Sequence, residues 1–296
     1  MKTAARFLVC AALSLALLST LNGFTLTVRA GTTIDAVNKS AYGANLGWMD
    51  WRGDSTHGAV IGEYVCSGYI YSANVGWINL GSGSPANGVQ YQNNSGSDFG
   101  VNHDGLGNLR GYAYGANVGW LNFENTGAPK VDLQTGIVTG YVWSANCGWI
   151  SLSNATAYVQ TDTIAPGIDS NNDGIADAWE LQHFGTINID PDADPDHDGM
   201  SNRQEYLAGT DPNDPSSLLQ ITAESFGPDG TTASLTWNSV LTRQYYIEKT
   251  SDLTMPWTDS GLGLISPDGA ATTRVFGDTS APARFYRVQA VRPLAP

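Results

Sequence analysis

Short alternating runs recur through the first half of the chain, and each run leads into the same phrase. Residues 69–71, 112–114 and 141–143 place aromatic side chains at every second position, followed by Ser/Gly-Ala-Asn-x-Gly and a tryptophan. A period of two is typical of a β-strand, and Asn and Gly can adopt the left-handed backbone conformations that a tight link needs. The pattern therefore predicts β-hairpins with Asn-x-Gly links.

The phrase occurs four times. Its tryptophans are spaced 29, 43 and 29 residues apart, which describes a pair of units that is itself duplicated. They are Trp48, Trp77, Trp120 and Trp149. Such repetition indicates stacked or symmetric units in which each hairpin buries one face and its neighbours complete the core. Further strands are expected at 101–103 and 131–133.

Two interpretations of the repeated aromatic residues stay open. They could be core or cross-strand packing residues, since aromatic pairs are a main source of sheet stability. Alternatively, they could form an exposed platform that stacks on sugar rings while Asn donates hydrogen bonds to hydroxyl groups. The Gly-, Ser- and Asn-rich loop at 81–100 accounts for the longer middle spacing and is a candidate contact surface.

The N-terminus has the pattern of a secretory signal peptide. Lys2 and Arg6 precede an apolar run at 7–21, and small residues end at Ala30. The run is too short to span a bilayer comfortably, and no later segment is more apolar. We therefore expect residues 1–30 to be removed and the rest to be secreted, without membrane insertion.

Charge is concentrated in one segment. The chain holds 28 acidic and 14 basic residues, but residues 162–216 alone hold 13 acids and a single base, Arg203. Such a block repels nucleic acid and anionic membranes, so nucleic acid is not an expected partner. The segment is either a solvated acidic linker or a set of cation sites.

Two stretches of this segment match a calcium loop, D-x-[DN]-x-[DN]-G-x5-E, at 169–180 and 194–205. In such a loop, oxygens from positions 1, 3, 5, 7 and 12 surround a cation that prefers six to eight of them, and Gly at position 6 permits the sharp turn. A short helix is expected after each loop, at 175–184 and 200–208. Gly185 and Gly209 would end them.

With the closing sequence EYLAGTDPNDPSS, these loops resemble the thrombospondin type 3 and dockerin-like calcium repeats of secreted bacterial proteins. The resemblance implies calcium as the cofactor and one ligand set in each loop. The first set is Asp169, Asn171, Asp173, Asp177 and Glu180 with the carbonyl of Ile175; the second is Asp194, Asp196, Asp198, Asn202 and Glu205 with the carbonyl of Met200. Asp211 is a further ligand by the same analogy. No helix precedes either loop, unlike the EF-hands of intracellular sensors.

The last quarter of the chain alternates in five short runs, at 219–223, 233–237, 245–249, 273–276 and 284–288. Strands at this spacing predict a small β-sandwich. Its phrases LTWNSV, YYIEKTSDL and ARFYRV resemble fibronectin type III-like modules, which implies a fold rather than an activity. The hairpin repeats resemble Gly-Trp-rich repeats of uncharacterised bacterial exported proteins, which implies no function.

The expected fold is therefore mainly β, in three parts behind the signal peptide. A hairpin repeat domain occupies 31–162, the tandem calcium loops occupy 163–216, and a fibronectin type III-like sandwich occupies 217–296. Two cysteines remain after cleavage, Cys66 and Cys147. In an exported protein such a pair favours a disulfide, the alternative being two free thiols packed as small apolar side chains.

Catalytic motifs are missing from the sequence. It has no Gly-x-Ser-x-Gly, His-Glu-x-x-His or phosphate-binding loop. A triad could be assembled only from loop residues around His57 or His103, and no two carboxylates stand out as a glycosidase pair. Such assemblies are mostly accidental, so we do not expect an enzyme.

The sequence thus favours a secreted or cell-surface structural or adhesive protein stabilised by calcium. The alternative is an extracellular carbohydrate-binding protein that uses the repeat aromatics, and the third option is an extracellular hydrolase. Expected partners are calcium and an extracellular polysaccharide or another surface protein. Exposure of the tryptophans separates the first two options, since a scaffold would bury them against one another.

Overall fold

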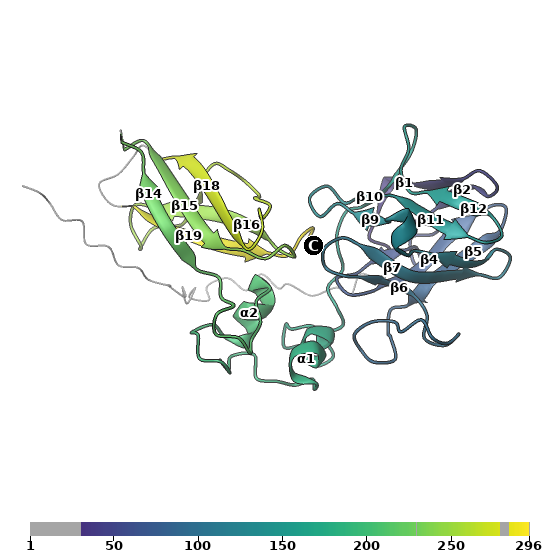
Figure 1. Cartoon of the computed structure of the whole chain (residues 1–296), viewed down its shortest axis with the longest axis horizontal. Helices are drawn as coiled ribbons and strands as arrows, with labels where there is room; N and C mark the ends of the chain where they lie inside the picture. Colours follow the sequence, from purple (N-terminus) through teal and green to yellow (C-terminus); the bar gives the residue numbers. More distant parts are fainter. Residues whose placement is uncertain (1–30, 229, 279–283, 296) are drawn as a thin grey trace, which may run out of the picture.

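A computed structural model describes residues 31–228, 230–278 and 284–295; the expected signal peptide at 1–30 lies outside this range. The described chain is mainly β with two short helices, which confirms the predicted fold class. Figure 1 shows a strand-rich N-terminal part, a second β part near the C-terminus and the two helices beside them.

Four hairpins form the N-terminal part. Their strands are β1 (Ile34–Gly43) with β2 (Gly47–Asp50), β4 (Cys66–Ser72) with β5 (Gly76–Ser82), β7 (Leu109–Gly115) with β8 (Gly119–Asn122), and β11 (Tyr141–Ser144) with β12 (Gly148–Ser151). Each hairpin pairs with the next, and β12 returns to pair with β1. The eight strands therefore close into a ring, which we call the hairpin ring.

Short strands extend the hairpin ring. They are β3 (Val60–Ile61), β6 (Val101–His103), β9 (Lys130–Val131), β10 (Ile137–Thr139) and β13 (Val159–Thr161), with the 3-10 turn η1 (Asn125–Gly127) after β8. The strand β6 coincides with the one expected at 101–103, and β9 overlaps the one expected at 131–133. Because β13 pairs with the first half of β1, the last strand of this part ties back to its first.

The links between paired strands explain why the phrase repeats. Each link glycine has a positive φ, between 75° and 79°, as expected. The four link asparagines were also expected to allow a left-handed conformation, but none of them has a positive φ. Instead, each asparagine side chain donates a hydrogen bond to a backbone carbonyl in the preceding link. The bonds are Asn74 to Leu46 (2.8 Å), Asn117 to Val75 (3.1 Å), Asn146 to Val118 (3.0 Å) and Asn45 to Cys147 (3.1 Å). These four bonds form a closed cycle at one end of the hairpin ring.

The predicted disulfide is wrong, since Cys66 and Cys147 are both free. Cys147 lies in a link, whereas Cys66 begins β4, six residues before that strand reaches its own link at Ser72. Six residues of strand span about 20 Å, far beyond the Cα separation of about 7 Å that a disulfide allows. Burial raises the pKa of the Cys66 thiol to about 12, so it acts as a small apolar core residue.

The helices are α1 (Asp177–Phe184) and α2 (Asn202–Ala208), each beginning two residues later than expected. Ile175 and Met200 still belong to the preceding loops, because the residues before each helix, Ala176 and Ser201, are extended. Gly185 and Gly209 end the helices with φ of 69° and 75°, as predicted. The segment has its own small core, formed by Ile175, Ala176, Trp179 and Tyr206 with Tyr64 from the hairpin ring.

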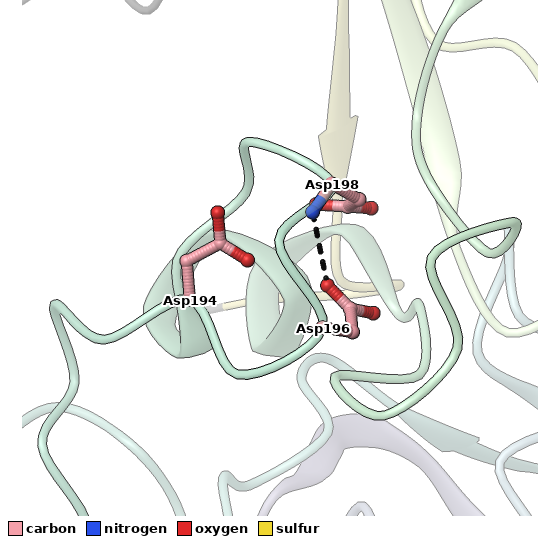
Figure 2. A group of neighbouring side chains, drawn as sticks. All are labelled: Asp194, Asp196 and Asp198. Atoms are coloured by element: carbon pink, nitrogen blue, oxygen red, sulfur yellow. Dashed lines mark hydrogen bonds between the residues drawn. The ribbon is translucent and has the colours of Figure 1, made fainter.

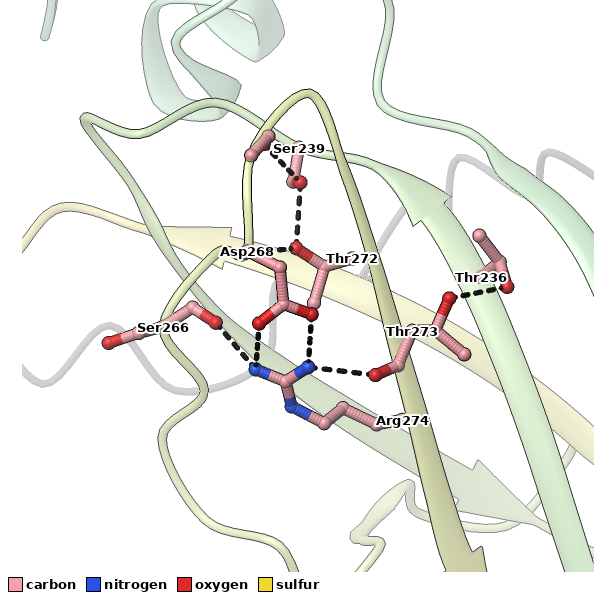
Figure 3. A network of polar contacts seen from close by, with 8 residues as sticks. Thr236, Ser239, Ser266, Asp268, Thr272, Thr273 and Arg274 are labelled. Atoms are coloured by element: carbon pink, nitrogen blue, oxygen red, sulfur yellow. Dashed lines mark hydrogen bonds and ion pairs between the residues drawn. The ribbon is translucent and has the colours of Figure 1, made fainter.

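The C-terminal part, which we call the sandwich, consists of two three-stranded sheets over one core. One sheet holds β14 (Ile221–Phe226), β15 (Thr232–Asn238) and β18 (Ala271–Gly277); the other holds β17 (Thr258–Asp259), β16 (Gln244–Thr250) and β19 (Phe285–Val291). Trp237 and Tyr245, from opposite sheets, are both buried in the shared core. At the surface of the sandwich, Arg274 forms a bidentate ion pair with Asp268 (Figure 3). This pair fixes the loop before β18 and lowers the pKa of Asp268.

The chain end returns from the sandwich to the hairpin ring. Leu294 packs against the core of the ring, and its carbonyl accepts a hydrogen bond from the amide of Ile164 at 3.0 Å. The side chain of Gln244 donates a further hydrogen bond to the carbonyl of Leu133 at 3.0 Å. The two β parts therefore touch directly and are not merely spaced apart by the acidic segment.

Candidate metal centres and aromatic surface

The second calcium loop brings three aspartates together. Asp194, Asp196 and Asp198 each offer a carboxylate oxygen within 4.8 Å of the others (Figure 2). Backbone amides orient these carboxylates: Asp194 accepts from His197 (2.8 Å) and Gly199 (3.0 Å), and Asp198 accepts from Met200 (2.7 Å). One oxygen of Asp196 and one of Asp198 remain buried without a hydrogen-bond partner.

Glu205, at position 12 of this loop, is fully buried on α2. Neither of its carboxylate oxygens has a hydrogen-bond partner, and the same holds for the side-chain oxygen of Asn202, which is 2% exposed. Burial raises the pKa of Glu205 to about 8. The nearby hydroxyl of Thr210, itself buried without a hydrogen-bond partner, opposes this rise, and the charges of Asp196 and Asp198 add to it. A buried carboxylate beside other carboxylates is costly unless a cation accompanies it.

The donor atoms of the second loop fit calcium. They are all oxygens, from side chains and from the carbonyl of Met200. Five of the side-chain oxygens are buried without a hydrogen-bond partner: one each on Asp196, Asp198 and Asn202, and both on Glu205. Calcium prefers six to eight such oxygens in a flexible arrangement. The left-handed φ of 97° at Gly199 makes the sharp turn that places the aspartates on the same side.

The first loop has the same spacing but satisfies more of its own groups. Asp169 accepts hydrogen bonds from the amides of Asp173 (3.2 Å) and Gly174 (2.9 Å), and the amide nitrogen of Asn171 donates to Asp173 (2.8 Å). Glu180 is fully buried, and one of its oxygens accepts from Ile189 at 3.0 Å while the other has no partner. Burial is also the main reason that the pKa of Glu180 is raised.

Two residues implied as ligands have protein partners. Asp177 accepts hydrogen bonds from the backbone amide and the hydroxyl of Ser170. Asp211 is half exposed and lies 3.3 Å from Nδ1 of His183 on α1. It is close enough to Glu205 to raise the pKa of that residue further, but its role as a ligand stays a prediction.

The repeated tryptophans lie on the outer face of the hairpin ring. Trp48, Trp77, Trp120 and Trp149 are 52%, 46%, 46% and 44% exposed. The alternate positions of the same strands, such as Ile70 and Ile78, fill the inside. Each tryptophan sits opposite an aromatic residue of its hairpin, with ring centroids 4.8 to 5.0 Å apart. The core interpretation is therefore wrong. Because the rings pack in cross-strand pairs and also face solvent, their exposure by itself does not choose between a scaffold and a carbohydrate-binding surface.

Three of these tryptophans also pack on a segment that follows the preceding hairpin. A Cβ on Gly53 would lie 2.8 Å from the ring of Trp77, and one on Gly127 would lie 3.2 Å from the ring of Trp149. Trp120 meets Phe99 with centroids 5.1 Å apart. Trp48 belongs to the first hairpin, and Tyr42 is its one aromatic neighbour among the described residues. Trp48 is accordingly the most exposed of the four.

The two histidines considered for a triad, and the acidic residue Asp98 of the loop at 81–100, lie in different settings. His103 is buried; its Nδ1 donates to the carbonyl of Gly62 at 3.0 Å and its Nε2 accepts from the amide of Gly107 at 3.1 Å. Burial lowers the pKa of His103, which keeps it neutral. His57 is exposed beside Asp54. Asp98 holds the loop at 81–100 by accepting from the amides of Ala86 and Gln92.

Sequence reasoning missed one cluster, formed by Glu63, Arg243 and Arg292. Glu63 lies 3.3 Å from Arg243 and 3.4 Å from Arg292, and all three line a small cavity between the hairpin ring and the sandwich. These residues come from three distant parts of the chain, so no local spacing could have indicated them.

Comparison with known proteins bears on the acidic segment. The family model of the bacterial TSP3 repeat matches residues 169–186 and 194–215, which contain both loops and both helices. No curated protein and no solved structure matches the chain. The segment is therefore a calcium-binding type of repeat, whereas the fibronectin type III-like and Gly-Trp-rich resemblances stay predictions.

Proposed function

We propose that this protein is a secreted or cell-surface structural or adhesive component without catalytic activity, held in shape by two bound calcium ions. The observation that carries the proposal is the fully buried Glu205: neither of its carboxylate oxygens has a hydrogen-bond partner, and burial together with the charges of Asp196 and Asp198 raises its pKa. The match to the bacterial TSP3 repeat supports the same ion. Among the helices of the described residues, none has the length and apolar character needed to cross a membrane.

The chain itself prepares the second site. Hydrogen bonds from the backbone amides of His197, Gly199 and Met200 orient the carboxylates of Asp194 and Asp198 in the ion-free protein. This preorganisation lowers the entropy lost when an ion binds. When bound, calcium supplies two positive charges among carboxylates that otherwise repel one another. Extracellular modules bind calcium at roughly 0.1 to 1 mM, so extracellular calcium would keep both sites filled.

Calorimetric titration of the full mature chain, residues 31–296, tests the proposal. Two binding events are expected for the native sequence and one for Asp198→Ala. Asp214→Ala is the matched control, because it removes an exposed carboxylate of the same segment whose hydrogen bonds come from Ser216, which is not a ligand. Native protein that binds fewer than two ions would contradict the proposal.

The exposed tryptophans favour a second candidate, the binding of an extracellular polysaccharide or another surface protein. A half-exposed indole on a rigid sheet can stack on a sugar ring, and Trp48 is the most accessible of the four. A glycan array probed with the full mature chain should then lose signal for Trp48→Ala. The variant Leu106→Ala, which shortens an exposed apolar side chain at a loop tip, serves as the control. An array without any signal above background would exclude the glycan option.

A further inference from the structure

The short helix α2 contacts residues of both β parts. Its C-terminal carbonyls have no partners within the helix. The guanidinium of Arg243, from the sandwich, donates to the carbonyl of Tyr206 at 2.7 Å and to that of Leu207 at 2.9 Å. A cation at this position also interacts favourably with the helix dipole. The sandwich is thus attached to the end of α2 by a buried arginine, which is 5% exposed.

The same arginine reaches the hairpin ring. Nη1 of Arg243 lies 3.3 Å from Glu63, and the other oxygen of Glu63 lies 3.4 Å from Arg292 at the end of the sandwich. Both arginines are largely buried, so removing their anion would leave two positive charges in a poorly solvated place. This group, Glu63 with Arg243 and Arg292, is called the junction below.

Tyr206 completes the contact from the side of the helix. Its ring packs in the small core that includes Tyr64 of the hairpin ring, and it is 2% exposed. Its hydroxyl accepts a hydrogen bond from Arg292 at 2.8 Å. Gly209 leaves room for this arrangement, because a Cβ there would lie 2.9 Å from Cγ of Arg243.

The residue before Tyr206 is Glu205, the last ligand of the second calcium loop. One turn of α2 therefore carries two kinds of group. It holds the carboxylate of Glu205, which needs a cation, and it holds the side chain of Tyr206 and the backbone carbonyls that contact both β parts. Without an ion, the two buried oxygens of Glu205 stay unsatisfied, and moving α2 toward solvent relieves that cost. Such a movement would withdraw Tyr206 and the helix carbonyls from the junction.

We infer that calcium in the second loop fixes α2 at the junction, so that calcium controls the docking of the sandwich onto the hairpin ring. The inference rests on the calcium binding proposed above and adds a consequence for how the β parts are held. Calcium removal then undocks them, although each keeps its own core.

Docking of the sandwich onto the hairpin ring can be measured by hydrogen exchange of the full mature chain at a backbone amide whose hydrogen bond joins the two parts. The amide of Ile164 donates to Leu294 across the boundary, and we expect its protection to fall at least about 10-fold when calcium is chelated. Amides of the β4–β5 hairpin, which bond within the ring, should keep their protection. Asp198→Ala in calcium should behave like the chelated native protein, whereas Asp214→Ala should behave like the native protein in calcium.

Unchanged protection of Ile164 in chelator, in a protein that calorimetry shows to bind calcium, would overturn the inference while leaving the proposed function intact. Absence of any calcium binding would overturn both. Glu63→Gln supplies a second test, because coupling between two sites is reciprocal. Weakening the junction should lower the calcium affinity of one site about 5-fold or more, in the range typical of coupled sites. Unaltered affinity at both sites would contradict the coupling.

Discussion

The two calcium loops share one spacing but differ in how far the protein satisfies their ligands. In the first loop, one buried ligand oxygen lacks a partner, on Glu180; in the second loop there are five. Asn171 and Ser170 supply hydrogen-bond donors within the first loop, whereas the second has aspartates at all of positions 1, 3 and 5. A motif match therefore does not state how strongly a loop depends on its ion, and here the dependent loop is the one whose helix joins the two β parts.

The largest expected effect is the difference between the two loops in how much faster a protease cuts them once calcium is removed. At about 2 mM calcium, a site with a dissociation constant of about 0.1 mM stabilises its fold by about 2 kcal/mol, or about 20-fold in the open population. Limited proteolysis should accordingly cut the second loop about 20-fold faster in chelator, with a smaller increase in the first loop. Cleavage that rises equally in both loops would remove the distinction.

Single substitutions should reproduce this order. Asp198→Ala should lose the calcium-dependent stabilisation of its loop, about 2 kcal/mol, and Asp173→Ala should lose less because its loop retains internal hydrogen bonds. Chemical unfolding at fixed calcium, followed through segment-specific hydrogen exchange, measures both. The comparison fails if Asp173→Ala proves the more damaging of the two.

Exchanging the residue types at position 3, Asn171 in the first loop and Asp196 in the second, should make the calcium dependence of each loop more like that of the other. Asn171→Asp removes the side-chain amide donor to Asp173 and gives the first loop aspartates at all of positions 1, 3 and 5. We expect calcium affinity at that loop to rise several-fold and the calcium-free stability to fall by about 1 kcal/mol, the usual value of one hydrogen bond. Calorimetry and unfolding in chelator provide the two numbers. Asp196→Asn in the second loop should act in the opposite direction.

The smallest effect concerns Ser170. Its hydroxyl and amide both donate to Asp177 at the start of α1. Ser170→Ala removes the hydroxyl donor at an exposed position, so the calcium-free first loop should lose about 0.5 kcal/mol. Thermal unfolding in chelator detects this loss. Ser201 directly precedes α2 and exchanges hydrogen bonds with Gln204, which is not a ligand, so Ser201→Ala is the contrasting variant.

Local patterns in the sequence were enough to predict the loops, the helices and the hairpins. Position 6 glycine, the closing glutamate and the helix-ending glycines act within a dozen residues, so their spacing carries the geometry. The closing of the hairpin ring could not be predicted, because β12 and β1 meet through two residue pairs, 42 with 151 and 43 with 150. Nothing local in either strand specifies that contact.

The sequence also could not show whether the repeated aromatic side chains face the core or the solvent. Inner positions such as Ile70 and outer positions such as Tyr71 and Trp77 are all apolar, so alternation assigns two sets without stating which faces the core. The core takes the aliphatic residues of the strands together with Trp51 and Phe123, while the repeated tryptophans pair with aromatic residues on the outer face. The missing disulfide has a similar cause, since strand direction, and not residue count, puts Cys66 and Cys147 at opposite ends of their hairpins.

In the proposed function, the two unsatisfied oxygens of Glu205 are calcium ligands. A crystal structure of the mature chain grown in calcium tests this directly through anomalous scattering at the second loop. We expect an ion with a Glu205 oxygen at about 2.3 to 2.6 Å, together with oxygens from Asp194, Asp196 and Asp198. An ordered second loop without an ion, in which Glu205 is paired with a protein cation or with water alone, would show that Glu205 is not a calcium ligand.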